Sequence, residues 1–395
     1  MPFVEAKCTN CGSVLPVDST KDAWICGYCG TPFVVEKAIN NYNTVNNINA
    51  NVVNFYGAGN SDFEIRAGVL EKYNGSSPDV IIPNNVIEIG LNAFQNCKGL
   101  HSVVIPQSVK KIGSLTNSIH GFGAFAGCRN LEKITIPSNV EQIGKGTFTN
   151  CTSLKSVRIE KGVTQIGDQC FENCGQLTDV FLPDSLVYIG QNAFTGCNML
   201  TNITIPDNVT ELIGVFQQCK SLEQIKLPSH LIKLRGTFRD CPSLKSINIP
   251  DSVKELGAGT FEKCISLSNI QLPTNLEEIG GGDDCVYGCF RECTSLKRIS
   301  LPNVLKRIGD GAFLDCTNLT EITIPSTVVT MGGGAFAGCS RLFTVSLPAR
   351  FNNQESLKNS FLGTPYIEKC GFCPRCGEKI GIFGKCKNKY CNYQK

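Results

Sequence analysis

The chain has 395 residues, with 37 Lys and Arg against 34 Asp and Glu, and 23 cysteines. This near-balance excludes a general attraction to nucleic acid or to an anionic membrane, so any such contact must be local. No apolar run approaches the roughly 20 residues of a membrane helix, and the start MPFVEAKCTN carries no export pattern. We therefore expect a cytoplasmic protein without a membrane span.

Residues 1–38 hold two Cys-x2-Cys pairs, Cys8 with Cys11 and Cys26 with Cys29, and 14 residues separate the pairs. Two such knuckles direct four thiolates at one tetrahedral ion, and the glycines that follow them allow turns that aim backbone N–H groups at sulfur. The segment resembles a zinc ribbon. A thioredoxin-like redox pair is the alternative, but it needs a single Cys-x2-Cys in a βαβ setting. We predict a structural zinc ion.

Residues 39–61 are rich in Asn and poor in charge, which predicts a linker. In the alternative, Val45, Ile48, Val52 and Val53 form a short strand that protects the open edge of the repeat array that follows. The ribbon together with EKAINNYN resembles the head of many uncharacterised proteins of Gram-positive bacteria, which suggests a portable adaptor.

Residues 62–365 repeat the pattern LxxIxIPxxVxxIGxxAFxxC. In this pattern LxxIxI alternates like a strand, Pro ends it, VxxIG is a second short strand, and AFxxC is a tight turn that buries its Phe. One coil cannot bury its own apolar edge, so we predict about twelve stacked coils, roughly 4.8 Å apart, with stacked Phe rings. Most neighbouring repeat cysteines are 22 or 23 residues apart, with two intervals of 31 and 29. These cysteines are Cys97, Cys128, Cys151, Cys174, Cys197, Cys219, Cys241, Cys264, Cys293, Cys316 and Cys339.

The pattern resembles the BspA-like leucine-rich repeat, over about three quarters of the chain. The resemblance implies a β-rich, right-handed leucine-rich-repeat solenoid with short turns or 3-10 segments. It also implies protein binding, because known relatives are often secreted or surface proteins that bind other proteins. A surface adhesin is therefore an alternative to a cytoplasmic scaffold.

The repeat cysteines are predicted to be core residues, because Cys is small, frequently buried and able to donate a weak S–H hydrogen bond to a buried carbonyl. A ladder of equivalent thiols defines no disulfide pairs. Cys170 and Cys289 stand at the Ala of AF in their coils, so we expect them in the core as well. Cys285 and Cys370 receive no structural assignment.

Residues 366–395 hold a second four-cysteine set, Cys373, Cys376, Cys386 and Cys391, which resembles a less regular zinc ribbon. Because a four-thiolate site is closed, it holds no water for hydrolysis, and we predict a second structural zinc ion. Cys370 is an alternative ligand in this set.

The same segment concentrates basic residues near Phe372, Phe383 and Tyr390. Such a mixture can bind a nucleic-acid strand, whereas the simpler interpretation is a solvated small domain whose aromatic rings pack beside zinc. We favour the simpler interpretation and keep nucleic-acid binding as an alternative. The basic residues are Lys369, Arg375, Lys379, Lys385, Lys387 and Lys389.

We find no catalytic constellation in the sequence. The glycine-rich stretches IGKGTF, GFGAFAG and GGGAFAG lack the phosphate-loop pattern, and the three histidines fall in different coils. Asp283 and Asp284 beside Cys285 suggest either a metal site or a solvated acidic loop, and we favour the loop. We predict a monomeric, non-enzymatic protein-binding scaffold.

Two insertions, SLTNSIHGFG after Gly113 and GGDDCVYG after Gly280, fall between IG and AF. Equivalent positions of a solenoid share a face, so we expect both loops at one edge with a partner-binding strand row between them. Alternatively, this turn simply tolerates extra residues. Aromatic and Arg side chains dominate interface energies, which makes Phe181 beside Arg158 the predicted hot spot. The exposed row comprises Arg158, Phe181, Thr204 and Lys226, continued by Asn248 and Gln271.

Overall fold

The computed structural model describes residues 62–115, 123–281, 287–381, 384–389 and 391–393, and the backbone of four short strands nearer the N-terminus. Of these four, β1 (Phe3–Lys7) pairs with β2 (Val14–Asp18), and β3 (Ala23–Ile25) pairs with β4 (Pro32–Val34), both antiparallel. The predicted linker, including its alternative strand around Val45–Val53, lies outside the described residues.

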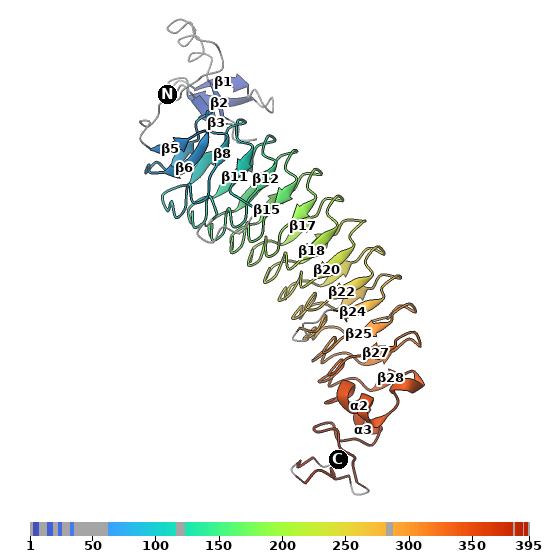
Figure 1. Cartoon of the computed structure of the whole chain (residues 1–395). Helices are drawn as coiled ribbons and strands as arrows, with labels where there is room; N and C mark the ends of the chain where they lie inside the picture. The colour runs from blue at the N-terminus through green and yellow to red at the C-terminus, as the bar shows by residue number, and fades with distance from the viewer. Residues whose placement is uncertain are drawn as a thin grey trace, which may run out of the picture.

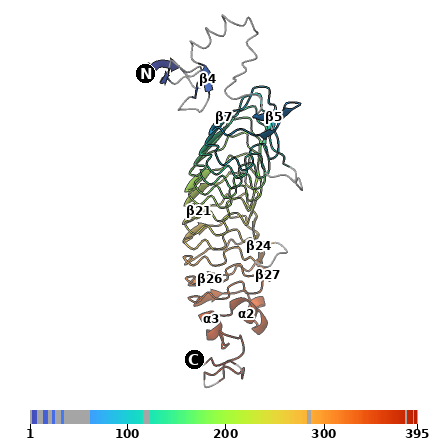
Figure 2. The same cartoon turned by 90° about the vertical axis from the view of Figure 1, so that its left-hand side faces the viewer.

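The repeat array is a rod of about twelve stacked coils (Figure 1). Most coils contribute two short strands, and equivalent strands of successive coils pair in parallel, so that two strand series run along the rod. Figure 2 shows the two series on opposite sides of the rod, with β7 and β21 on one side and β24 and β27 on the other.

The first strand series comes from the LxxIxI segments. It comprises β7 (Asp79–Ile81), β9 (Ser102–Val104), β11 (Lys133–Ile136), β13 (Ser156–Ile159), β15 (Asp179–Phe181), β17 (Asn202–Thr204), β19 (Gln224–Lys226), β21 (Ser246–Asn248), β23 (Asn269–Gln271), β26 (Glu321–Thr323) and β28 (Thr344–Ser346).

The second strand series comes from the VxxIG segments and forms a seven-stranded and a six-stranded sheet. It comprises β6 (Val69–Tyr73), β8 (Glu88–Ile89), β10 (Lys111–Ile112), β12 (Gln142–Ile143), β14 (Gln165–Ile166), β16 (Tyr188–Ile189), β18 (Glu211–Ile213), β20 (Lys233–Arg235), β22 (Glu255–Gly257), β24 (Glu278–Gly281), β25 (Arg307–Ile308) and β27 (Thr330–Met331). An antiparallel strand, β5 (Phe63–Arg66), pairs with β6 and ends this series.

Proline ends the strands of the first series, as the pattern predicts. In one coil β9 stops before Pro106, whose carbonyl then accepts a hydrogen bond from the backbone N–H of Val109 at 3.1 Å. Pro has no N–H to donate to a neighbouring strand, so at the strand end its presence costs the sheet no hydrogen bond. The chain thereby turns from the first series to the second within a few residues.

A column of phenylalanine rings fills the centre of the rod and confirms the predicted stacking. Consecutive ring centroids lie 4.8–6.2 Å apart with interplanar angles of 3–17°. Tyr73 packs against the first ring at a tilt of 31°, and Tyr366 meets the last one edge-on. The fully buried column comprises Phe94, Phe125, Phe148, Phe171, Phe194, Phe216, Phe238, Phe261, Phe290, Phe313, Phe336 and Phe361.

The repeat cysteines lie beside this column, and their predicted core role is confirmed. From Cys128 to Cys339, each Sγ lies 3.0–3.3 Å from the carbonyl oxygen of the Phe in the preceding coil. The cysteines of the described residues are free thiols. Cys170 and Cys289 are fully buried too. Only in the first coil is the repeat cysteine, Cys97, half-buried.

The turn before each repeat cysteine uses a left-handed backbone conformation that the sequence analysis did not identify. All eleven residues at this position have φ between 57° and 75°. Gly and Asn tolerate this region best, and Asp tolerates it better than most residues. Asn150 and Gly196 fit this preference, whereas Lys263 and Glu292 do not.

Two helices close the C-terminal end of the rod. They are α2 (Gln354–Phe361) and α3 (Pro365–Lys369), preceded by a 3-10 turn, η1 (Ala349–Phe351). Side chains cap both helices, since Asn353 accepts from the Ser356 N–H and Thr364 from the Ile367 N–H. The carbonyl of Ser360 accepts from Phe336 N at 2.8 Å, so α2 satisfies a backbone group of the last coil.

The sequence analysis predicted no helix here, and its boundary between residues 365 and 366 falls within α3. Among the described residues, no helix is long and apolar enough to cross a membrane.

Candidate functional sites

The C-terminal cysteines converge after α3. The Sγ atoms of Cys373, Cys376, Cys386 and Cys391 all lie within 4.8 Å of one another. Cys373 and Cys391 are 3.7 Å apart and Cys376 and Cys386 are 3.3 Å apart. Zinc–sulfur bonds of about 2.3 Å in a tetrahedron require sulfur–sulfur distances of about 3.8 Å. The geometry therefore fits a four-thiolate metal ion, and these four residues can hold one.

Tight backbone turns hold the four sulfur atoms in place. Gly377 N donates to the carbonyl of Cys373 at 2.8 Å with a φ of 73°, and Cys391 N donates to the carbonyl of Asn388 at 3.0 Å. Asn388 N in turn donates to the Sγ of Cys386 at 3.4 Å. Such amide donors stabilise negative charge on sulfur, which a metal ligand requires.

Electrostatics distinguish the thiols of this cluster. Desolvation raises the pKa of Cys376, but the backbone N–H of Glu378 and the thiols of Cys386 and Cys373 outweigh it and lower that pKa to about 7. Burial raises the pKa of Cys373 above its ordinary value. The pKa of Cys376 therefore lies closer to neutral pH than that of Cys373, and a bound cation would favour ionisation of all four thiols.

The other predicted metal residues lie outside the described part of the chain. These are Cys8, Cys11, Cys26 and Cys29, together with Asp283, Asp284 and Cys285 of the second insertion. Cys370 is half-buried at the end of α3 and packs against the core rather than belonging to the four-sulfur group.

The predicted partner-binding row lies on the exposed side of the first strand series. Arg158 on β13 and Phe181 on β15 are neighbours in register, and the guanidinium carbon of Arg158 lies 4.8 Å from the Phe181 ring centroid. Thr204 and Lys226 are register neighbours on β17 and β19. The Phe181 side chain is 48% exposed.

The two insertions do not flank that row, so this part of the prediction is wrong. Gly113 follows β10 and Gly280 lies in β24, so both insertions leave equivalent strands of the second series. The row belongs to the first series, on the opposite side of the rod (Figure 2). The LxxIxI and VxxIG segments of one coil face different ways, a relation that spacing alone does not reveal. Residues 116–122 and 282–286 lie outside the described residues.

A buried ionic cluster was missed by the sequence analysis. Glu262 is 1% exposed, and its carboxylate lies 3.0 Å from Arg239 Nε and 3.8 Å from Arg291 Nη1 on the neighbouring coils. Burial raises the pKa of Glu262, while the two arginines oppose the rise. The guanidinium carbon of Arg239 also lies 4.0 Å from the ring centroid of Tyr287, near the end of the second insertion. The sequence does contain a sign of this cluster. In three successive coils the residue that follows the column Phe is basic, acidic and basic, in FRDC, FEKC and FREC.

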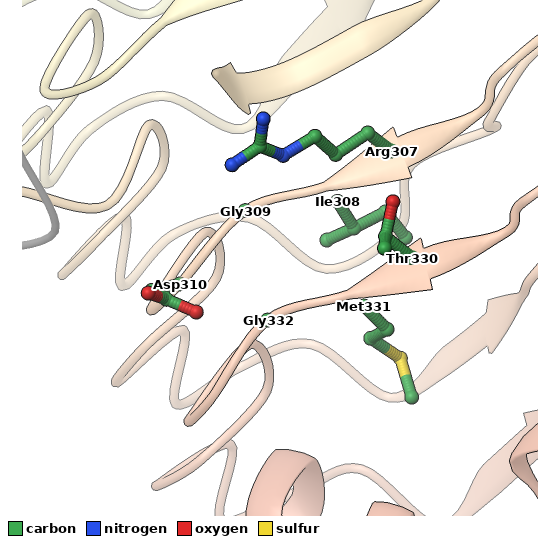
Figure 3. Close-up of a pocket in the computed structure, with 7 residues that line it drawn as sticks. All are labelled: Arg307, Ile308, Gly309, Asp310, Thr330, Met331 and Gly332. Carbon is green, nitrogen blue, oxygen red and sulfur yellow. The ribbon is translucent and has the colours of Figure 1, made fainter. Parts of the chain in front are cut away.

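A shallow hollow of about 270 Å³ lies between β25 and β27 (Figure 3). Its polar groups are the guanidinium of Arg307, the hydroxyl of Thr330 and the carboxylate of Asp310, and the last already accepts from Gly333 N at 2.7 Å. A Cβ on Gly332 would lie 2.3 Å from Asp310 N, so glycine is required there for coil stacking. We attribute the hollow to these closely stacked glycines rather than to a ligand.

Comparisons with known proteins agree with this architecture. The sequence matches the family described as "BspA type Leucine rich repeat region (6 copies)" over residues 64–116, 118–235, 213–287, 235–360 and 286–389. No curated protein matches the chain. Among solved structures, a leucine-rich repeat protein from Bacteroides ovatus ATCC 8483 is 25% identical with a TM-score of 0.54, covering 91% of this chain and 96% of that chain.

Two further solved structures are similar. The T. pallidum leucine rich repeat protein TpLRR is 30% identical with a TM-score of 0.44, over 47% of this chain and 90% of that chain. The pneumococcal vaccine antigen PcpA is 22% identical with a TM-score of 0.43, over 69% of this chain and 64% of that chain. From its repeats, its two strand series and the family match along the rod, the chain belongs to the BspA-type leucine-rich repeat family.

Proposed function

We propose that the chain is a non-enzymatic, cytoplasmic protein-binding scaffold. Its rod presents the partner surface, and two structural zinc ions stabilise the small segments 1–38 and 366–395. The observation that carries the proposal is the exposed contact between Arg158 and Phe181 on the first strand series. Membership of a leucine-rich repeat family is consistent with a binding role.

The chemistry of this row favours a protein partner. A half-exposed aromatic ring with a guanidinium over it is the kind of group that contributes most to protein interfaces. Farther along the row, Thr204 and Lys226 add a hydroxyl and an ammonium group, which can satisfy polar groups of a partner at the rim. The Cys373 cluster has four ligands and therefore supports a structural rather than a catalytic role for zinc.

The test is affinity capture from the native cell with Phe181→Ala. We expect the recovered partner to fall at least tenfold, since hot-spot truncation costs about 2 kcal/mol or more, with an unchanged melting temperature. Phe343→Ala is the matched control, because Phe343 is 49% exposed and also lies under a cation, Lys369, at 5.7 Å. Equal capture by native protein and Phe181→Ala would refute this surface.

Nucleic-acid binding is the second candidate, supported by the exposed positions of Arg375, Lys379, Lys385 and Lys387 around the cysteine cluster. It predicts a salt-dependent gel shift of the full chain that charge reversal at Lys379 and Lys385 abolishes. Cell fractionation tests the proposed location, and recovery at the surface or in the medium would favour an adhesin instead.

A further inference from the structure

Charge is strongly segregated along a chain whose formal net charge is only +3. Residues 162–219, which we call the acidic band, contain six acidic residues and no Lys, Arg or His. Residues 369–395, which we call the basic tail, contain seven Lys and Arg and one acidic residue. The acidic residues of the band are Asp168, Glu172, Asp179, Asp184, Asp207 and Glu211.

The acidic band also exposes apolar side chains. Val187 and Tyr188, at β16 of the second strand series, are 47% and 46% exposed. The Tyr188 hydroxyl lies 3.4 Å from Asp168 Oδ1. Burial, Asp168 and the negative charge of Glu211 on the next coil together raise the pKa of Tyr188. Exposed apolar groups rimmed by carboxylates form a surface suited to a cationic partner.

The basic tail presents the opposite charge. Arg375, Lys379, Lys385 and Lys387 are exposed, whereas the one acidic residue, Glu378, is paired with Lys358 at 3.1 Å. A zinc ion with four thiolates would add a charge of about −2, which leaves the tail cationic.

The two surfaces cannot meet within one chain. Gly363 N donates to the Pro374 carbonyl at 2.8 Å, which holds the start of the tail against the end of the rod. Between Phe194 in the band and Phe361 at that end lie seven ring-to-ring steps of 5.1–6.2 Å. Figure 1 shows β15, β17 and β18 in the other half of the rod from the C-terminus.

We propose that two copies of the chain form an antiparallel dimer in which the basic tail of each lies on the acidic band of the other. The distance between tail and band is the same in both copies, so an antiparallel arrangement makes both contacts at once around a two-fold axis. Such an isologous contact closes the assembly at two chains. The inference is tested at Asp184, Glu211, Lys379 and Lys385, none of which belongs to the proposed Arg158–Phe181 row, so the two proposals can fail separately.

The test measures the mass of the full chain by light scattering at about 0.1 M and about 1 M salt, between which the Debye length falls from about 10 Å to about 3 Å. We expect twice the chain mass of 42.8 kDa in low salt and a shift to the single-chain mass in high salt. Asp184→Lys with Glu211→Lys should raise the dimer Kd roughly 100-fold, and so should Lys379→Glu with Lys385→Glu.

Asp184 and Glu211 are chosen because Asp168, Asp179 and Asp207 accept hydrogen bonds from neighbouring coils. Combining both reversed pairs in one chain should restore the dimer, which excludes misfolding as the cause of its loss. The matched control is Glu255→Lys with Glu278→Lys. These two residues are register neighbours on β22 and β24, outside the band, so the control makes the same change of charge elsewhere on the rod. This control should remain dimeric.

Three outcomes would overturn the inference. The first is a single chain in low salt. This includes a single chain whose acidic band binds a cationic peptide, or whose basic tail binds RNA, because the partner of that surface would then not be a second copy. The second is a dimer that survives both reversals. The third is an assembly that grows beyond two chains with concentration, since that is the behaviour of an open, head-to-tail contact.

Discussion

Cysteine serves opposite purposes in the rod and in the C-terminal segment. In the rod each repeat thiol from Cys128 to Cys339 is buried and lies against the carbonyl of the preceding coil, and burial raises the pKa of Cys151 to about 12. In the C-terminal segment four sulfur atoms face one another, and the pKa of Cys376 is lowered to about 7. Stacked coils surround each thiol with apolar groups and a carbonyl, whereas tight turns surround it with amides and other sulfur atoms. The backbone therefore decides between packing and metal binding.

Removing one ligand from the C-terminal cluster should break this contrast most severely. We expect two zinc ions per native chain and one in Cys373→Ser, with loss of the fold after α3. Structural zinc contributes an apparent 10–16 kcal/mol in zinc-finger peptides, so its loss exceeds what so small a segment can compensate. Elemental analysis measures the zinc, and amide hydrogen exchange follows the segment.

The control for this experiment is Cys97→Ser, which changes the half-buried repeat cysteine. It should keep both zinc ions. Equal zinc content in Cys373→Ser and native protein would contradict the assignment of the cluster.

The repeat period was sufficient to predict the rod. One coil had to turn at Pro106 and bury Phe125, and stacking then placed the Cys128 thiol against a carbonyl. The features that escaped prediction depend on three-dimensional relations between coils. Lys263 adopts a left-handed turn although its own preference opposes it, because neighbouring coils impose the turn.

The candidate sites were predictable only in part. Spacing identified the four cysteines after α3, since sequence-local knuckles determine which sulfur atoms meet. It identified Phe181 and Arg158 as exposed neighbours, because strand alternation fixes which side chains face outward. It misplaced the insertions relative to that row, because alternation carries no information on which side of a closed coil the second strand lies. The helix α2 was missed because QESLKNSF is too short to show a clear period.

Truncation of one ring in the phenylalanine column should be the next largest effect. Phe171 is fully buried between rings at 5.3 and 5.2 Å. Phe171→Ala should lower the free energy of unfolding by about 3–5 kcal/mol, because it removes apolar contacts on both sides and leaves a cavity. Denaturant unfolding measures it, and zinc content should not change. Phe181→Ala is the exposed control and should lower the free energy of unfolding by less than about 1 kcal/mol. Similar losses for the two variants would contradict the claim that the phenylalanine column stabilises the rod.

The smallest effect concerns the protons on the buried thiols and sharpens the contrast with the C-terminal cluster. The folded pKa of Cys151, about 12, lies above its ordinary value near 9.0. The folded state therefore holds the proton more tightly, so this stabilisation is complete below pH 9 and is lost as pH rises toward 12. Per buried thiol the loss approaches about 1.4 kcal/mol per pH unit in that range. Under reducing conditions, Cys151→Ala should lose about 1 kcal/mol less than native protein between pH 8 and pH 10.

Val157→Ala makes the matched comparison, since Val157 is buried in β13 and does not titrate. This variant should be less stable than native protein at every pH but should show the native dependence on pH. The three proteins carry the same lysines and tyrosines, so the difference between variant and native protein reports the thiol. If Cys151→Ala also followed the native pH dependence, the thiol would not be held protonated by the fold. The thiols of the rod would then ionise as readily as those of the metal cluster. Only the arrangement of the sulfur atoms would distinguish the packing cysteines from the metal ligands.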